Sequence, residues 1–203
     1  MSVIRGNTCG VASCQRDRFG GVSRGEMLPI VTTVAAEDVG RWFPLVLATH
    51  AELRGLSPEE ARVFEGVAAE HGRTAGFRLV VAVDARERVV GYAYGFAGGP
   101  GQAVTDEMAA VIGPDRAAEW LGHSFVFAQF GVLQRERRKR TGTRLYQELF
   151  DGLPHRRAVL TVRMGSRPAI GFYRASGWEV LYEDFVTAAG HGPYLIMGKR
   201  LAG

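Results

Sequence analysis

Residues 132–145 read VLQRERRKRTGTRL, a strongly basic loop between two apolar segments. The segment before it, residues 124–132, has the composition of a buried strand, and Leu145 begins the apolar face of a helix that opens near Thr141. The first N–H groups of a helix have no partner inside it, and the helix dipole adds partial positive charge there. Such a terminus binds phosphate, and the flanking cations favour a pyrophosphate.

The rest of the chain predicts alternating strands and helices around this loop. Strands are expected at residues 30–34, 77–83, 89–96, 158–163, 178–186 and 194–200, and helices at 38–53, 57–70 and 169–177. Asp38 is expected to cap the first helix, and Ser57 with Glu60 forms a capping box at the second. The alternation predicts a single α/β domain, and hairpins such as 77–96 make its sheet mixed.

The connection at residues 104–122 shows only a weak helical pattern, which Gly113-Pro114 interrupts. Long connections between strands are often functional, so this one is a candidate substrate lid. Residues 1–26 lack periodicity and predict a disordered tail, so the domain is expected over residues 27–203.

The composition is that of a globular protein, and the small excess of positive charge suits an anionic ligand. The net charge is +4, and no apolar run is long enough to span a membrane. The first residues lack the apolar core of a signal peptide, so a cytoplasmic location is expected. The cysteines, Cys9 and Cys14, are interpreted as incidental thiols in the tail, and no metal site is predicted.

The basic loop resembles the acyl-CoA motif of the GNAT superfamily of N-acyltransferases, Arg/Gln-x-x-Gly-x-Gly/Ala. Without gaps, Arg137 takes the first position, Arg140 the first glycine and Gly142 the second. In that family the backbone amides of this loop hold the CoA pyrophosphate, and the end of the preceding strand pairs with pantetheine and the acyl carbonyl. The resemblance therefore implies a CoA site made of Val132, Leu133, Arg137, Arg138, Lys139, Arg140, Thr141, Gly142 and Thr143.

Arg140 departs from this pattern, since glycine there lets the backbone approach a phosphate closely. The arginine still offers its N–H, and its guanidinium could reach a phosphate or could crowd the cradle.

A second stretch, residues 166–178, reads SRPAIGFYRASGW and resembles the family element Asn-x-x-Ala-x-x-Phe-Tyr-x-x-x-Gly-Phe. Ser166 replaces the usual Asn, and both residues can cap a helix. The resemblance adds Ser166 to the residues of the CoA site. Tyr173 matches the family tyrosine that often protonates the departing CoA thiolate, although a core tyrosine is the plain alternative. Gly177 suits a helix end that needs positive φ. The resemblance covers about residues 28–200 and implies the GNAT fold, a mixed, mostly antiparallel central sheet flanked by helices.

The family implies direct acyl transfer in a ternary complex, from acetyl-CoA to the amine of a small molecule. A backbone N–H near Val132 would stabilise the oxyanion, and Tyr173 would act as general acid. GNAT relatives are often dimers, so a homodimer is an open expectation.

Many relatives carry a glutamate on the strand at 124–132, but in this chain that strand holds no Asp, Glu or His. Gln129 could position a water or a substrate group there.

His123, just before that strand, is a candidate base, since its ordinary pKa suits the task, although a loop histidine without a chemical role is the alternative that we favour. The remaining candidates are carboxylates, namely Asp106, Glu107, Glu183 and Asp184.

Aromatic residues suggest an apolar acceptor, with core packing as the alternative. They are Tyr92, Tyr94, Phe96, Trp120, Phe125 and Phe127. Three other functions stay open. The chain could be a GNAT-fold protein without acetyl transfer, either a CoA-binding sensor or partner or an enzyme of different chemistry. The charges at 135–140 could bind nucleic acid, although no stacking aromatics are interleaved with them, or could simply be solvated.

Overall fold

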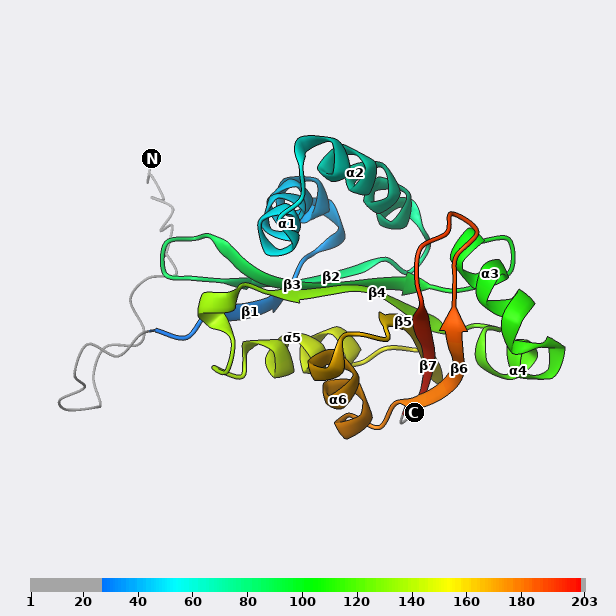
Figure 1. The fold of residues 1–203 in the computed structure, drawn as a ribbon. Coiled ribbons are helices and arrows are strands. Elements are labelled where there is room, and N and C mark those ends of the chain that lie inside the picture. The colour runs from blue at the N-terminus through cyan, green and yellow to red at the C-terminus, as the bar shows by residue number, and fades with distance from the viewer. Residues whose placement is uncertain (1–26, 202–203) are drawn as a thin grey trace, which may run out of the picture.

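The computed structural model describes residues 27–201, and its centre is a seven-stranded sheet (Figure 1). The predicted tail, with Cys9 and Cys14, lies outside the described residues. The strands are β1 (Ile30–Thr33), β2 (Arg78–Val83), β3 (Val89–Ala97), β4 (Phe125–Val132), β5 (Arg157–Arg163), β6 (Glu179–Phe185) and β7 (Tyr194–Arg200). They lie in the order β1-β2-β3-β4-β5-β7-β6.

Six α-helices surround the sheet within the described part of the chain. They are α1 (Val39–Arg54), α2 (Pro58–Arg73), α3 (Ala103–Ile112), α4 (Pro114–Trp120), α5 (Thr141–Phe150) and α6 (Arg167–Ala175), and short 3-10 turns stand at η1 (Ala36–Asp38) and η2 (Gln134–Glu136). Figure 1 shows α1 and α2 over one face, α5 and α6 over the other, and α3 and α4 at the far end near β6. None of the helices in residues 27–201 has the length and apolar character needed to cross a bilayer.

The predicted mixed sheet is confirmed, and one pairing breaks its antiparallel order. Only β4 and β5 run parallel, and they pair over just Phe125 with Ala158 and Val126 with Val159. On its opposite edge β5 pairs along its whole length with β7. The carboxyl-terminal half of β4 therefore separates from β5 and leaves a gap in the middle of the sheet.

A bulge in β4 coincides with this separation. Tyr94 of β3 pairs with Gln129 while Gly95 pairs with Phe127, so Ala128 is an extra residue in β4. Bulges bend a strand and turn its side chains to the other face. Accordingly Phe127 and Phe130 both belong to the core on the α5–α6 face, although an odd spacing separates them.

The local sequence signals have mixed outcomes. The capping box is confirmed, because the Glu60 N–H donates to Ser57 Oγ and the Ser57 N–H donates to Glu60 Oε2. The predicted cap at Asp38 is wrong, since η1 precedes α1 and the Asp38 side chain caps no amide. The 3-10 turn already fixes the chain direction there, so the helix needs no side-chain cap.

The connection at 104–122 forms the hairpin α3–α4 rather than a free lid. Met108, Ile112, Trp120 and Leu121 are buried against Ile196 and the rest of the core at the β6–β7 end of the sheet. Glu119 at the end of α4 accepts from Arg200 at 2.6 Å. This segment is therefore part of the packed structure, and the interpretation as a substrate lid was wrong.

Candidate functional site

The gap between β4 and β5 exposes backbone groups at the end of β4. The Leu133 N–H donates to Val90 O of β3 at 2.9 Å. Because alternate residues of a strand direct their backbone groups to opposite sides, the N–H and C=O of Val132 face away from β3. They point into the gap between β4 and β5. One partner is already present there, since Arg137 Nε donates to Val132 O at 3.2 Å.

The loop between β4 and α5 has the backbone of an anion site. Arg140 is the N-cap of α5 with φ 61° and ψ 8°, and Arg138 also has positive φ, 64°. Successive amides around such left-handed residues form concave anion-binding surfaces. The position where the family motif has its first glycine thus adopts a glycine-like conformation, although an arginine occupies it.

The first amides of α5 precede its hydrogen-bond ladder. The Arg144 N–H donates to Arg140 O at 3.0 Å, so the N–H groups of Thr141, Gly142 and Thr143 come before the first bond that the helix makes. Thr141 is buried, and its Oγ1 has no hydrogen-bond partner among the described residues.

Gly142 lets this helix terminus lie close to β4. A Cβ at Gly142 would be 3.2 Å from Phe130 Cζ and 3.6 Å from Val132 Cγ2. The second glycine of the motif therefore serves close packing of the helix on the strand. As a result the amides of α5 and the gap-facing amide of Val132 belong to one compact region.

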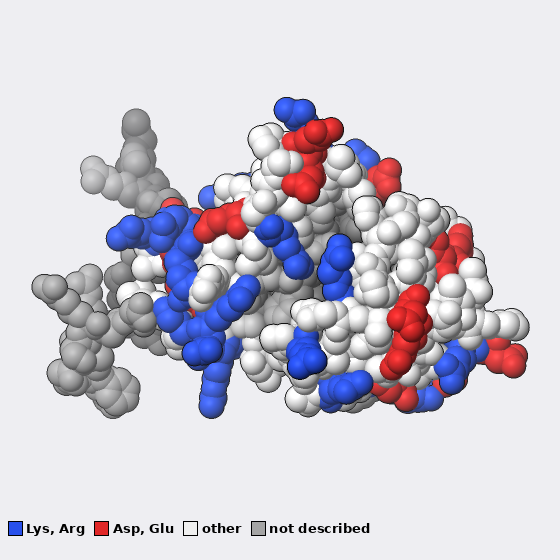
Figure 2. All heavy atoms as spheres, viewed as in Figure 1, with Lys and Arg blue, Asp and Glu red and all other residues white. Residues whose placement is uncertain are grey.

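The basic side chains of the loop divide into paired and exposed groups. Arg135 forms an ion pair with Glu52 of α1 at 2.9 Å, and Lys139 pairs with Glu136 at 3.4 Å. Arg138 and Arg140 are exposed. Figure 2 shows Lys and Arg side chains gathered at the end of the molecule where Figure 1 places this loop. The cluster therefore presents positive charge beside the open amides.

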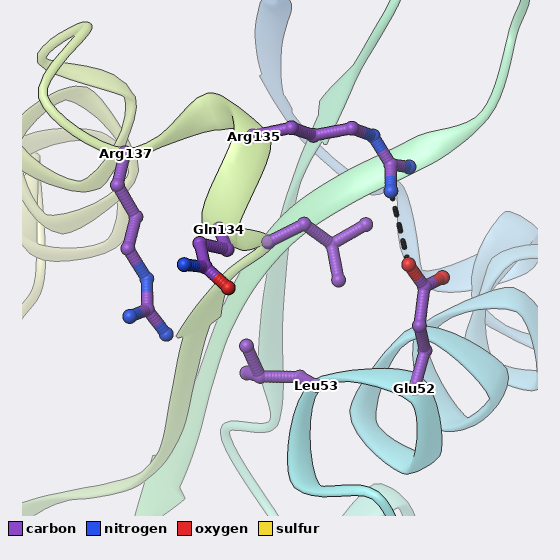
Figure 3. A pocket seen from close by; sticks show the side chains of 6 residues that line it. Glu52, Leu53, Gln134, Arg135 and Arg137 are labelled. Atoms are coloured by element: carbon purple, nitrogen blue, oxygen red, sulfur yellow. Dashed lines mark hydrogen bonds and ion pairs between the residues drawn. The ribbon is translucent and has the colours of Figure 1, made fainter.

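A cavity of about 490 Å³ opens between the end of α1 and this loop. Its lining residues are Glu52, Leu53, Leu133, Gln134, Arg135 and Arg137. In Figure 3 the Gln134 and Arg137 side chains point into the same space as Leu53, while Arg135 reaches across to Glu52. Leu133 is buried and forms an apolar part of the wall. The wall of the cavity thus combines apolar side chains with one carboxylate and two guanidinium groups.

Tyr173 lies in α6, on the face of the sheet that α5 also covers. Its ring packs edge-to-face on Phe127 of β4 and on Trp178, with ring centroids 6.0 and 5.9 Å apart. Only 8% of Tyr173 is exposed, and this burial raises the pKa of its hydroxyl, so the phenol stays protonated at neutral pH. Such a group can donate a proton but does not accept one readily.

The ends of α6 agree only in part with the motif. Gly177 has φ 82°, which confirms the predicted role of a glycine at the helix end. Ser166 stands at the N-cap of α6, but its side chain caps no amide, so the expected cap is absent. The Ser166 carbonyl oxygen accepts the Ile170 N–H as part of the helix ladder. Ser166 follows β5 and therefore lies at the same edge of the sheet as the β4–α5 loop.

The candidate bases are not gathered at this site. His123 is exposed and precedes β4, so the length of that strand, roughly 25–30 Å, separates it from Val132. Asp106 accepts the Gly101 N–H, and Glu107 accepts the Ala188 N–H. Both carboxylates thus hold loops at the α3 end of the sheet.

Glu183 and Asp184 are exposed on β6, the edge strand farthest from β1. Gln129 is the one candidate that stays near the gap. It is partly buried and lies opposite Tyr94 on the α1–α2 face.

The aromatic residues are core, which corrects the hypothesis of an aromatic acceptor pocket. At most 4% of any of them is exposed, and they lie in three different clusters. They are Tyr92, Tyr94, Phe96, Trp120, Phe125 and Phe127. Period-2 alternation places residues on one face of a strand, but it does not show whether that face is lined by solvent or by a helix.

The end of α1 contributes residues that sequence reasoning did not find. Glu52 and Leu53 line the cavity, and His50, one turn earlier, bonds through Nδ1 to the Tyr92 hydroxyl. Burial lowers the pKa of His50 to about 4, so its imidazole is neutral at pH 7. The pattern of α1 predicted a helix, but nothing in it indicated which turn would meet β4.

The structure is an α/β chain in which a basic loop lies beside a gap in the sheet, and known proteins share this fold. The profile of the acetyltransferase (GNAT) family matches residues 47–178, so the chain belongs to that acetyltransferase family. No curated protein matches the chain at the sequence level.

Solved structures share the fold at low sequence identity. A histone acetyltransferase HPA2 and related acetyltransferase from Corynebacterium glutamicum is 18% identical, with 87% of this chain and 98% of that chain covered and a TM-score of 0.59. A putative GNAT-family acetyltransferase from Desulfovibrio desulfuricans is 18% identical, with 85% and 100% covered and a TM-score of 0.57. Naa20 from Chaetomium thermophilum, in complex with a bisubstrate analogue, is 19% identical, with 85% and 86% covered and a TM-score of 0.54.

Proposed function

We propose that this chain transfers an acetyl group from acetyl-CoA to the amino group of a small molecule. One observation carries the proposal, namely that the gap-facing N–H of Val132 lies beside the open amides at the start of α5. The Val132 N–H suits a thioester carbonyl, and the amides at the start of α5 suit a pyrophosphate. A single ligand that carries both groups could therefore use both sets of donors.

The residues at this junction fit acyl-CoA. The amides of Thr141, Gly142 and Thr143 would hold the pyrophosphate, and the exposed guanidinium groups of Arg138 and Arg140 add positive charge. Lys139 shares its charge with Glu136 and contributes less. The backbone of Val132 and the apolar side chain of Leu133 suit the pantetheine arm. The cavity of about 490 Å³ is within the usual size of small-molecule sites.

Tyr173 is proposed as the proton donor. The amine nitrogen attacks the thioester carbon, the carbon–sulfur bond breaks, and the sulfur takes the proton of the Tyr173 hydroxyl. The nitrogen loses one proton to solvent, and the phenolate regains one from solvent. The Tyr173 hydroxyl carries its proton at neutral pH even with an ordinary pKa, and the Val132 N–H would stabilise the oxyanion.

The acceptor is proposed to be a small amine that approaches the cavity at the end of α1. Glu52 lines that cavity and is paired there with Arg135 at 2.9 Å, so an ammonium group would have to share the carboxylate with that guanidinium. Gln129 could orient the amine from the α1–α2 face, since an amide can bind a substrate but cannot remove its proton near pH 7. We therefore expect the amine to react as its free base.

Calorimetry with acetyl-CoA and thiol release with a panel of amines test the proposal together. Tyr173→Phe should lower kcat by about 10²- to 10⁴-fold and leave the Kd of acetyl-CoA unchanged. Tyr182→Phe, at an exposed tyrosine of β6, is the matched control and should retain full activity. Binding of acetyl-CoA without thiol release for any amine would instead support a CoA-binding protein that has lost transfer. No binding of acetyl-CoA would overturn the proposed function.

A further inference from the structure

Arg54 brings an unpaired positive charge to the end of α1. It is the last residue of that helix and is exposed, and Gly55, with φ 63°, ends the helix directly after it. Within residues 27–201 the guanidinium of Arg54 forms no hydrogen bond or ion pair. The neighbouring carboxylate on α1, that of Glu52, is already paired with Arg135. The charge of Arg54 is therefore available to a ligand.

Two observations place this end of α1 beside the gap in the sheet. Leu53, the residue before Arg54, lines the cavity and lies so close to Gly131 of β4 that a Cβ there would collide with it. Burial raises the pKa of Tyr92 on the α1–α2 face and that of Tyr173 on the α5–α6 face, and the charge of Arg54 opposes both increases. Because α1 covers only one face of the sheet, a charge in its last turn acts on Tyr173 across the gap (Figure 1).

The side chains around this place favour a negatively charged group. β4 itself carries no charged side chain, and in the described part of the chain no carboxylate contributes to the pKa shift of either tyrosine. Figure 2 shows Lys and Arg side chains around the recess between the α1–α2 layer and α6. An acceptor with additional positive charge is repelled by such a field, whereas an acceptor that carries an anionic group is attracted.

We propose that the acceptor is an amino acid whose carboxylate is bound by Arg54, an inference that deepens the proposed function and rests on it. A guanidinium presents parallel N–H donors that match the two oxygens of a carboxylate. An amino acid carries this anion and the nucleophilic amine a few bonds apart. With its carboxylate on the last turn of α1, its amine can reach the gap where the Val132 N–H would hold the thioester carbonyl. Arg54 is thus a specificity-determining residue for the acceptor.

The contact with the carboxylate is remote from the bonds that form and break, so it has the same strength before and during acyl transfer. Its loss should therefore raise KM for the amino acid and leave kcat nearly unchanged. A bond to a charged group that is lost in this way weakens binding about 10- to 100-fold. The carboxamide of the same amino acid has no negative charge and should depend little on Arg54.

The test compares amino acids with their own carboxamides, for example glycine, β-alanine and phenylalanine with the three matching amides. Thiol release from acetyl-CoA is measured for wild type, Arg54→Ala, Arg54→Lys and Arg62→Ala. Arg62 has the same charge and is exposed on α2, away from the cavity. Calorimetry with acetyl-CoA checks that each variant keeps the wild-type Kd for the donor.

We expect Arg54→Ala to raise KM for the preferred amino acid about 10- to 100-fold and to leave KM for its carboxamide nearly unchanged. Arg54→Lys keeps the charge without the paired donors, so its KM should lie between the two. Arg62→Ala should behave as wild type. Because Arg54 also acts on Tyr173, its removal can change kcat, but by the same factor for an amino acid and its carboxamide. The ratio between the two substrates therefore isolates the carboxylate contact.

Two results would overturn the inference while the proposed function stands. One is an equal loss for both members of a pair in Arg54→Ala, which would mean that the guanidinium only balances the dipole at the end of α1. The other is transfer by the wild type to amines that lack a carboxylate and to no amino acid. Binding of acetyl-CoA without thiol release for any amine would overturn the proposed function and this inference with it.

Discussion

The backbone at Arg140 allows strain and charge to be measured separately. Arg140 has φ 61° at the N-cap of α5, a left-handed conformation that is unfavourable for any residue with a Cβ. Arg140→Ala and Arg140→Gly both remove the guanidinium, and both keep the amide. Their difference in stability therefore reports the backbone conformation alone.

The size of this difference follows from two opposing effects. A left-handed backbone costs a residue with a Cβ about 1–2 kcal/mol, and glycine escapes this cost. The greater freedom of glycine in the unfolded chain costs about 0.4–1 kcal/mol. We therefore expect the glycine variant to be more stable than the alanine variant by about 0.8 kcal/mol, within a range of about 0–1.6 kcal/mol.

The control reverses the sign. Arg62 is exposed in the middle of α2, where glycine should be less stable than alanine by about 1 kcal/mol. Urea unfolding followed by circular dichroism gives the free energies, provided that the slope m stays constant across the four variants. If Arg140→Ala proves more stable than Arg140→Gly, as is expected at Arg62, the left-handed conformation at this residue is wrong.

Three further perturbations test the packing around the site. Gly131→Ala should destabilise the fold by about 1–3 kcal/mol, because a Cβ there would collide with Leu53 and lie 2.9 Å from the Tyr92 hydroxyl; Gly171→Ala, with open space around its Cβ, should not lower the midpoint of thermal unfolding. Ser57→Ala should cost about 1 kcal/mol in chemical denaturation, since the Glu60 amide loses its acceptor, and no loss would mean that the capping box is not formed in solution. His50 has its pKa lowered from 6.5 to about 4, so the unfolded chain binds its proton first and stability should fall as pH drops from 6.5 to 4, by about 3 kcal/mol from this residue. His50→Gln should flatten that part of the stability–pH curve, and an unchanged slope would contradict the buried neutral imidazole.

Much of the fold could be predicted because the signals that decide it are local. The capping box at Ser57, the glycine at the end of α6 and the apolar runs of β2 and β3 each depend on a few neighbouring residues. The basic loop was placed correctly for the same reason, since it joins the end of β4 to the start of α5.

The unpredicted features depend on contacts between distant residues. Met108 and Trp120 are buried only because α3 and α4 meet the β6–β7 end of the sheet, which no periodicity within residues 104–122 reveals. The bond from His50 to Tyr92 joins residues 42 positions apart. The turn of Arg137 toward Val132 is a choice of rotamer, and the charge pattern of the loop contains no information about it.

Because β4 pairs with β5 only at Phe125 and Val126, the rest of β4 has an unpaired edge in the middle of the sheet. Unpaired strand edges are templates on which a foreign chain can add a strand and begin aggregation, and proteins blunt them with bulges and charged side chains. Both devices are present here, since Ala128 bulges where the pairing ends and Arg137 covers the last carbonyl of β4. The gap in the sheet is therefore protected against addition of a foreign strand.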